Sequence, residues 1–270
     1  MEIIKKIVKV GNSAGVLLPK EWQGGEAKVI LLEKPIKIEE DLFKILTPYL
    51  TSILGIYLTG SYSRNEQTSN SDIDVVVISS DINKRFKQGK YEIIITSLET
   101  ANEVLQKNLI LLYPMLLEAK VILNNKLLDD LLKLKIKRKA LKWHLETSQS
   151  SLNIVKSFLD LDDELEESGG LVYPLILRLR GIYLIDCIIN NRAYFKKNFL
   201  NLLSKNTEHA AEIYKVYESD KRSEIVKVVR KEDLYKLYIL AMKMLEEQKK
   251  YVKNSPNADF IPQKFKLKGH

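Results

Sequence analysis

Two aspartates separated by one residue, shortly after a glycine-serine pair, are the side chains of this chain best suited to chemistry. Gly60-Ser61 ends an apolar segment, ten residues follow, and Asp72-Ile-Asp74 opens a second apolar segment. Residues two apart in a strand point to the same face, about 6.6 to 7 Å apart, so we expect Asp72 and Asp74 to project together. Because two adjacent carboxylates repel each other, a divalent cation is their natural partner. The pattern predicts a site for Mg²⁺ or Mn²⁺, and two Mg²⁺ ions about 3.5 to 4 Å apart would suit phosphoryl transfer.

The glycine-serine pair suits the phosphate-binding half of such a site. Gly60 lets the backbone approach a phosphate closely, and Ser61 offers an amide and a hydroxyl to the terminal phosphates. An isolated pair of aspartates at this spacing is more often a solvated turn than a site. A preceding Gly-Ser at the end of a strand, together with a buried strand after the aspartates, is what favours a functional site here.

Three regions of different texture have to position these residues. Residues 39–123 alternate helix-like and strand-like segments, which predicts an α/β catalytic core with a mixed sheet. Residues 1–38 are short β-branched runs separated by glycines and predict a small β unit, and residues 124–252 predict a bundle of four or five helices. Residues 253–270 are basic and weakly periodic, so we expect a loose tail.

The core should contain a helix near 40–52, strands at 55–58, 73–78, 91–95 and 121–123, and a helix from residue 99. In the N-terminal unit, the β-branched runs predict strands at 3–10, 16–18 and 29–32.

The segment around the aspartates resembles the nucleotidyltransferase superfamily of the polymerase β type, and especially its minimal nucleotidyltransferase branch. Gly60-Ser-Tyr-Ser-Arg-Asn-Glu66 is similar to that branch's Gly-Ser-x-Ala-Arg-Gly-Glu, and Ser71-Asp-Ile-Asp74 to its Ser-Asp-Ile-Asp. Asn65 replaces the family's glycine, although asparagine also tolerates a left-handed backbone. The resemblance covers roughly residues 40–123. It implies a nucleoside triphosphate donor, with ATP expected, release of pyrophosphate, and transfer of a nucleotide to a hydroxyl.

The same family uses a third carboxylate on a neighbouring strand. Glu92 is the only acid in the next strand-like run, so the resemblance gives it that place, either as a metal ligand or as the base for the attacking hydroxyl. Glu118, ahead of the following strand, is the alternative. Arg64 either pairs with the triphosphate through its fork of donors or is a surface arginine. We therefore expect Asp72, Asp74 and Glu92 to bind metal and carry catalysis, and Gly60, Ser61 and Arg64 to bind the nucleotide.

The N-terminal residues 1–38 resemble the small swapped-hairpin DNA-binding domains that include AbrB and the MazE antitoxin. The likeness rests on a strand, a Gly11-Asn-Ser turn, a second strand and Pro19, which should open a short helix. Two chains interleave in that family because so short a unit cannot bury a core alone, so the resemblance implies a homodimer. Residues 1–40 hold seven lysines against six glutamates. DNA binding through lysines 5, 6, 9 and 20 and pure dimerisation therefore stay equal alternatives.

Composition narrows the setting of the protein. The formal net charge of +8 favours phosphate-bearing partners without choosing between nucleotide and nucleic acid. Cys187 is the single cysteine, so a disulfide framework is excluded and a cytoplasmic protein is expected. The most apolar stretch, 171–190, contains Arg178, Arg180 and Asp186, which argues against membrane insertion. Those arginines either face the phosphates of the site, or one of them pairs with Asp186.

The helical region 124–252 resembles, in position and texture, the bundles that follow the catalytic module in antibiotic nucleotidyltransferases and the HEPN partners of minimal nucleotidyltransferases. Arg138 and His144 fit the spacing of the HEPN ribonuclease pair, but a charged helix face produces such a pair readily. The acidic segment 162–167 either receives a cationic acceptor or is a solvated connection between helices.

The sequence thus predicts a Mg²⁺-dependent nucleotidyltransferase that moves a nucleoside monophosphate from a nucleoside triphosphate to a hydroxyl on a small molecule, a protein or RNA. Two alternatives stay open. One is a DNA-binding regulatory or antitoxin protein that modifies a partner protein, and the other is a HEPN-like ribonuclease that uses Arg138 and His144.

Overall fold

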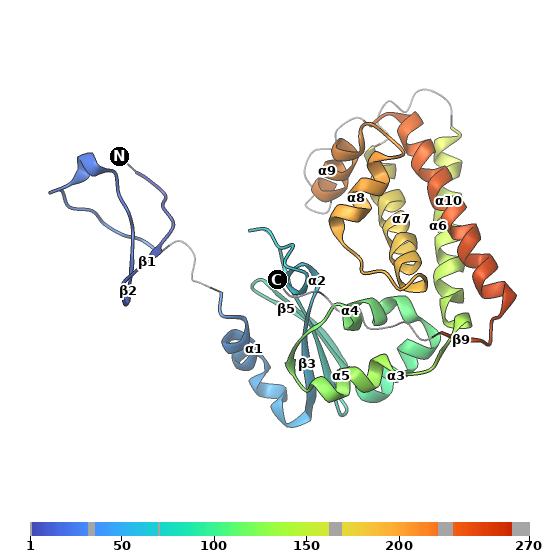
Figure 1. Cartoon of the computed structure of the whole chain (residues 1–270), viewed down its shortest axis with the longest axis horizontal. Helices are drawn as coiled ribbons and strands as arrows, with labels where there is room; N and C mark the ends of the chain where they lie inside the picture. Colours follow the sequence, from blue (N-terminus) through green and yellow to red (C-terminus); the bar gives the residue numbers. More distant parts are fainter. Residues whose placement is uncertain (1, 32–35, 70, 162–168, 221–228, 261–270) are drawn as a thin grey trace. The chain divides into compact units, whose positions relative to one another are not determined.

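The computed structural model describes residues 2–31, 36–69, 71–161, 169–220 and 229–260 (Figure 1). The chain divides into two units, Met1–Lys44 and Ile45–His270. The acidic segment 162–167 and the last ten residues of the expected tail lie outside the described residues.

One short β-hairpin is the regular sheet structure of the N-terminal unit. Strands β1 (Val8–Val10) and β2 (Ser13–Gly15) pair antiparallel, and Gly11 in their turn has a φ of +56°. The 3-10 helix η1 (Lys20–Trp22) follows Pro19, as the fixed φ of proline predicts. Helix α1 (Ile38–Leu46) begins at the end of this unit.

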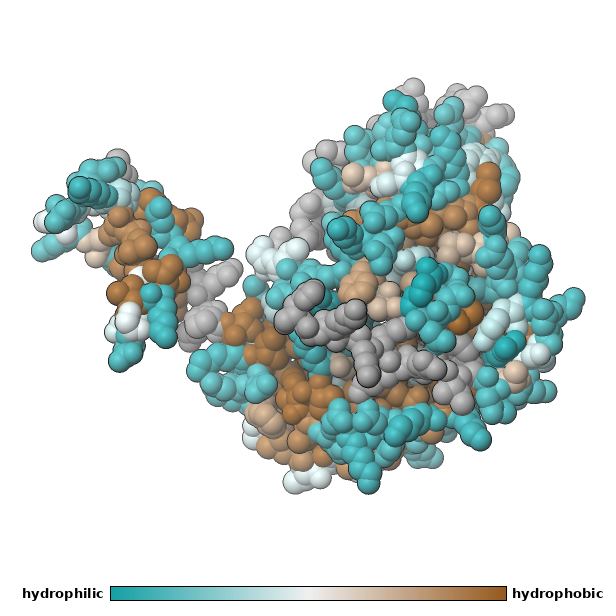
Figure 2. Space-filling view, viewed as in Figure 1, coloured by the Kyte–Doolittle hydropathy of each residue, from teal (hydrophilic) through white to brown (hydrophobic). Residues whose placement is uncertain are grey.

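The strand predictions for this unit were wrong in extent. Only the last three residues of 3–10 form a strand, β2 precedes the predicted 16–18 strand, and 29–31 are irregular. The physical reason is a missing second layer: many apolar side chains of these runs are exposed, among them Ile4 and Leu17. Two short strands that no described residue of the unit covers are marginally stable. Figure 2 shows hydrophobic residues gathered on the surface of this unit.

A five-stranded mixed sheet forms the centre of the larger unit. Its strand order is β5-β6-β4-β3-β7, with β4 and β6 parallel and the other neighbours antiparallel. The strands are β3 (Ile53–Thr59), β4 (Ile73–Ser79), β5 (Lys84–Gln88), β6 (Tyr91–Ser97) and β7 (Lys120–Leu123). The predicted mixed α/β fold is confirmed. Strand β5 was missed because its sequence, Lys-Arg-Phe-Lys-Gln, is mostly charged and has the composition of a loop.

Short helices cover part of one sheet face. They are the 3-10 helix η3 (Leu109–Leu111) and the α-helices α3 (Leu98–Lys107), α4 (Tyr113–Leu117) and α5 (Asn125–Leu132). The 3-10 helix η2 (Thr47–Ser52) and helix α2 (Gly60–Ser63) come directly before and after β3 in the chain. Val76 and Ile78 of β4 are fully buried in one hydrophobic cluster with residues of α3, α4 and α5. Asp74 shares their face because side chains alternate along a strand. The helices therefore bury one end of this face and leave the Asp74 end partly open.

Five further helices are described in the C-terminal part of the chain. They are α6 (Lys142–Leu159), α7 (Gly169–Ile189), α8 (Lys196–Ser204), α9 (Ala210–Asp220) and α10 (Lys231–Asn254). Helices α6, α7 and α10 pack on one another, and α9 packs on α7 and α8 (Figure 1). The predicted bundle is thus present, built around its own hydrophobic core. Within the described residues, every helix falls short of the length and apolarity that crossing a bilayer requires.

The described start of the predicted tail is ordered rather than loose. Helix α10 continues to Asn254, and β9 (Asp259–Phe260) pairs with β8 (Ile136–Lys137). This pairing places the chain after α10 alongside the segment that precedes α6, which includes the 3-10 helix η4 (Arg138–Leu141). An ion pair between Lys137 of β8 and Asp259 of β9 supports this strand pairing.

Candidate active site

A row of polar side chains crosses the sheet at one end of its strands. Thr59 of β3 lies opposite Asp74 of β4, Asp74 lies opposite Glu92 of β6, and Glu92 lies opposite Lys87 of β5. The row follows from the register because directly paired residues on neighbouring strands face the same side. Asp72 comes two residues before Asp74. The structure therefore brings together the three carboxylates that the sequence singled out.

The turn after β3 favours glycine. Gly60 has a φ of +69°, and a Cβ added there would lie 2.1 Å from Oδ2 of Asp74. A side chain at this position would strain the backbone and would force the Asp74 carboxylate to move. Ser63 Oγ donates to the carbonyl of Gly60 at 2.8 Å, and Thr59 Oγ1 donates to the carbonyl of Asp74 at 3.3 Å. These bonds hold the Gly-Ser turn against the aspartate strand.

Among the acids of this row, Asp74 has the most strongly shifted pKa. Its pKa is raised to about 6, first by burial and then by the charges of Glu92, Asp72 and Glu118. The shift has the sign expected for a carboxylate that loses water and faces other carboxylates. In the described part of the chain Asp74 has no ion pair, so its ionised form at neutral pH is poorly compensated. A bound cation would relieve this repulsion.

Two basic side chains of β5 form ion pairs with the other two acids, Asp72 and Glu92. Nζ of Lys87 donates to Oδ1 of Asp72 at 2.8 Å, and Nε of Arg85 donates to Oε1 of Glu92 at 3.1 Å. Sequence reasoning missed both basic residues because it missed β5. The available signal was the glycine at position 89, just ahead of the Glu92 run, which marks a hairpin turn and has a φ of +58°.

The carboxylates have the right chemistry to bind a divalent cation, but they are not arranged as a metal site in this structure. Among the described residues, no three His, Cys, Asp or Glu side chains converge into a ready metal-binding group. Carboxylate oxygens are nevertheless the ligands that Mg²⁺ prefers, and Asp72, Asp74 and Glu92 lie on adjacent strands.

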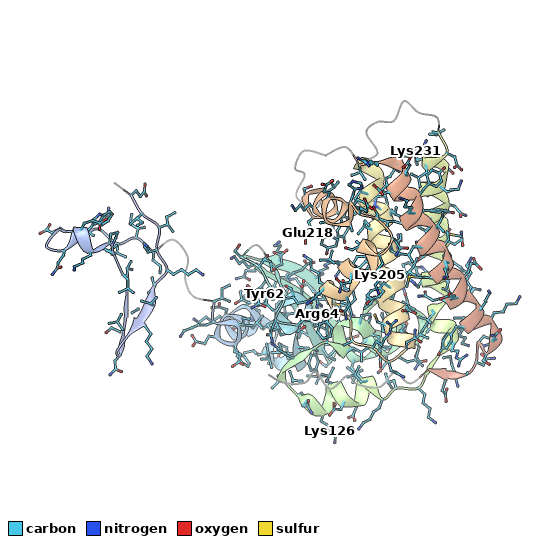
Figure 3. The ribbon with its side chains drawn as sticks, turned by 45° about the horizontal axis from the view of Figure 1, so that its top comes forward. Tyr62, Arg64, Lys126, Lys205, Glu218 and Lys231 are labelled. Atoms are coloured by element: carbon cyan, nitrogen blue, oxygen red, sulfur yellow. The ribbon has the colours of Figure 1, made fainter. Side chains whose placement is uncertain are left out.

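Arg64, labelled in Figure 3, is part of an ion network with Glu66 and Glu118. Its Nε donates to Oε2 of Glu66 at 2.8 Å, its Nη1 donates to Oε2 of Glu118, and its guanidinium lies 5.5 Å from the ring centroid of Tyr194. Glu118 also accepts the backbone N–H of Gly60 at 2.8 Å. Arg64, which we expected to face the triphosphate, is thus held by protein carboxylates, and so is the amide of Gly60.

Glu118, the alternative third carboxylate, belongs to this network rather than to the row of Asp74. Burial raises its pKa, against the effects of Arg64, the Gly60 amide and Arg180. Its contacts fix the conformation of the turn. The structure therefore places Glu92, and not Glu118, directly beside Asp74.

Asn65 and Glu66 link the motif to its surroundings. Asn65 has a φ of +57°, the left-handed conformation that the family's glycine would adopt there. Its Oδ1 accepts from Nζ of Lys120 at 2.6 Å. Oε1 of Glu66 accepts from the backbone N–H of Lys196 at 3.0 Å, so the motif is connected to the first residue of α8.

The structure rules out one of the two alternatives for the arginines of α7, namely an ion pair with Asp186. Asp186 accepts from Arg192 and from Nδ2 of Asn190, so its predicted pairing with an arginine of α7 was wrong. Arg180 instead donates to the hydroxyl of Tyr194 at 3.1 Å, on the ring that Arg64 also approaches. Arg180 therefore lies beside the Arg64 network. The sequence could not show this, because Tyr194 is supplied by the connection between α7 and α8.

Arg138 and His144 have separate structural surroundings. The guanidinium of Arg138 lies 4.0 Å from the ring centroid of Tyr251 and donates to its carbonyl. His144 is 3% exposed, its Nδ1 lies 3.4 Å from Oγ of Ser148, and burial lowers its pKa to about 4. A buried neutral imidazole does not favour acid-base work on RNA.

Comparison with known proteins assigns the central part of the chain. Residues 37–144 match the family model described as nucleotidyltransferase domain. No match was found among curated protein sequences.

Two solved structures resemble the chain at low identity. Spectinomycin adenyltransferase AAD(9) of Enterococcus faecialis, solved with ATP and spectinomycin, is 17% identical, with 77% of this chain and 97% of that chain covered and a TM-score of 0.42. A nucleotidyltransferase-like protein of Exiguobacterium sibiricum 255-15 is 13% identical, with 80% and 76% covered and a TM-score of 0.33. The match over residues 37–144 identifies this segment as a nucleotidyltransferase domain, and the protein that carries it as a transferase.

Proposed function

We propose that the protein moves a nucleoside monophosphate from a nucleoside triphosphate, with ATP the expected donor, to a hydroxyl acceptor, and that it requires Mg²⁺ or Mn²⁺. The observation that carries this proposal is the register of the sheet. Asp74 and Glu92 are direct neighbours on parallel strands, Asp72 lies two residues ahead, and the Gly60 turn closes on Asp74. The raised pKa of Asp74 supports it, because strongly perturbed acids in a partly open position are typical of functional sites.

Asp72, Asp74 and Glu92 would hold the divalent ion. The ion would neutralise the carboxylates and the triphosphate and would stabilise the charge that develops on the transferred phosphoryl group. Ser61, at the turn beside Asp74, is the residue we assign to the terminal phosphates. Arg64 holds Glu118, which in turn binds the amide of Gly60. We therefore assign Arg64 to positioning the turn rather than to direct contact with phosphate.

The reaction itself is a substitution at the α-phosphorus. The acceptor oxygen forms a bond to that phosphorus while the bond to the oxygen bridging the α- and β-phosphates breaks, and pyrophosphate leaves with the electron pair. The hydroxyl proton passes to a carboxylate. We assign this role to Glu92 because it lies opposite Asp74 in the sheet, beside edge strand β5, with its side chain 28% exposed.

The test is a transfer assay with each labelled nucleoside triphosphate, run with and without Mg²⁺ on the full chain and a cell lysate as acceptor source. We expect label to move only with metal, and Asp72→Asn or Asp74→Asn to lower the rate by at least about 10², roughly 2.7 kcal/mol of barrier. Glu103→Gln, an exposed acid on α3 paired with Lys107, is the control. Wild-type transfer in either aspartate variant would remove the proposal.

We further propose that residues 1–38 form a homodimer, with DNA as a second partner to be tested. A specific observation favours dimerisation: the apolar side chains of this unit are exposed, with Ile4 at 78%, Val29 at 66% and Ile30 at 65%. Such a collection of exposed apolar residues is typical of a surface that another chain covers. Light scattering should show a dimer that becomes a monomer when residues 1–36 are deleted; a truncated protein that remains dimeric would refute it. Binding of labelled duplex DNA to the full chain, but not to the truncated one, would support the regulatory alternative.

A further inference from the structure

We propose that Lys87 and Arg85 of β5 make metal binding at the carboxylate row conditional on the triphosphate. The inference rests on the proposed metal-dependent transfer and adds a regulation of that same site. The two cations neutralise Asp72 and Glu92 until a metal ion replaces them, and they then turn to the phosphates of the donor.

The first support is the pairing itself. Lys87 and Arg85 point to one side of the edge strand, two residues apart, and each binds a different carboxylate of the row. Asp74 lies two residues after one of those carboxylates and opposite the other, and it has no ion pair in the described ranges. The basic side chains thus hold Asp72 and Glu92 and leave Asp74 unpaired among the described residues.

The second support is the absence of a finished metal site. Asp74 and Glu92 are direct neighbours in the sheet, yet no three acidic ligands converge among the residues that the structure describes. A carboxylate oxygen that accepts a charge-assisted hydrogen bond is drawn toward its donor. The contacts of Lys87 and Arg85 therefore account for the separation of the acids.

The third support is the freedom of the two cations to move. Their side chains are 56% and 70% exposed, so a change of rotamer costs little packing. A metal ion and an ammonium group cannot occupy the same carboxylate oxygen, so the metal must displace them. Displaced cations next to the metal would repel it unless an anion is present, and the triphosphate supplies that anion.

Thermodynamic linkage turns this exchange into a measurable coupling. If the triphosphate binds the cations that the metal displaces, each ligand raises the affinity for the other by the same factor. Removing Lys87 or Arg85 should free the carboxylates. Metal should then bind more tightly without nucleotide, and the gain in metal affinity on adding nucleotide should shrink.

The experiment measures Mn²⁺ binding to the full chain by electron paramagnetic resonance, without nucleotide and with a triphosphate analogue whose α–β bridge is a methylene group. The variants are Lys87→Met, Arg85→Met and the double variant. Lys84→Met and Lys90→Met are matched controls, because each removes one positive charge from the same hairpin. Lys84 binds the hydroxyl of Tyr49, and Lys90 binds the carbonyl of Ser69.

We expect Mn²⁺ affinity without nucleotide to rise about two- to fivefold in each single variant and about tenfold in the double variant, with less than a twofold change in the controls. The coupling factor should fall by a similar amount in the variants alone. Equal changes in Lys87→Met and Lys84→Met would overturn the inference, because they would reduce it to general charge. Asp74→Asn separates the two levels of the argument: if that variant keeps the bound Mn²⁺, the proposed metal site itself is wrong, and the inference is overturned with it.

Discussion

Two groups of carboxylates flank the Gly60 turn, and they are treated oppositely by the fold. On one side, Glu66 and Glu118 share Arg64, whose side chain is only 10% exposed. On the other side, Asp72 and Glu92 of the sheet row pair with exposed cations, whereas Asp74 has no ion pair with any residue that the structure describes. The first group is satisfied internally and holds the turn in place. The second is left partly unsatisfied, which is the condition that an incoming cation can improve.

The difference teaches how a short sequence motif is divided between structure and chemistry. Arg64 and Asp74 belong to the same motif and lie ten residues apart. Arg64 nevertheless pairs with Glu118, which reaches it from the segment before β7. A motif match alone assigns both residues to the substrate, whereas their partners separate the two roles.

The largest effect on stability is expected when the ion pair between Arg64 and Glu118 is broken. Arg64→Met leaves Glu118 with a single amide partner, and we expect a loss of about 3 kcal/mol of stability, as when one partner of a buried ion pair is removed. Because burial already raises the pKa of Glu118, its ionised form carries the penalty, so the loss should be larger at pH 8 than at pH 5. Chemical denaturation at both pH values measures it. Arg85→Met, on the exposed side, should change stability by no more than about 0.5 kcal/mol; equal losses would contradict the comparison.

The next largest effect is on turnover and tests the role of Glu92 in the row of acids on the sheet. Glu92→Gln keeps the shape of the side chain and removes its charge, so turnover should fall by about 10-fold or more while triphosphate affinity changes little. Steady-state kinetics together with calorimetric titration of the nucleotide separates the two quantities. An unchanged melting temperature would show that the loss is not one of folding. Full activity would transfer the search for the third carboxylate to Glu118, whose present contacts would then have to be broken.

The smallest effect concerns the stability cost of leaving Asp74 unpaired. The pKa of Asp74 in the folded protein, about 6, lies above the 3.8 of an unperturbed aspartate, so the folded state binds this proton more tightly than the unfolded state does. The stability that the proton confers is present below pH 3.8 and is lost as the pH rises through 6. Without metal, Asp74→Asn should therefore raise stability at pH 8 by about 1 kcal/mol after allowance for solvent screening, a shift in melting temperature of roughly 2–4 °C.

Two further measurements check that sign. The stability difference between Asp74→Asn and the wild type should disappear as the pH falls toward 4, and added Mg²⁺ should stabilise the wild type alone. Metal affinity of the wild type should rise as the pH increases through about 6, because Asp74 binds a cation only when ionised. A variant less stable than the wild type at pH 8 would mean that Asp74 supports the fold rather than burdening it.

The positions of the buried strands along the chain and the motif around Asp74 were accessible from the sequence because local rules cover them. Alternation of side chains predicted that Asp72 and Asp74 share a face, and a Gly-Ser pair after an apolar run predicted the turn. Strands 55–58, 73–78 and 91–95 were found within two residues of their ends, since buried strands are continuous apolar runs. Edge strand β5 was not found, because an edge strand is charged and lacks that signal.

What the tertiary structure decided is which partner each charge meets. The sequence determined that Gly60, Asp72 and Asp74 form one motif and that the acid of the next strand is Glu92. It could not show that Lys87 reaches Asp72, that Glu118 reaches Gly60 and Arg64, or that Glu66 reaches the first residue of α8, which is 130 positions away. The physical reason is that backbone conformation depends on neighbouring residues, whereas an ion pair depends on the distance between side chains that only the packing of the sheet and the bundle brings together.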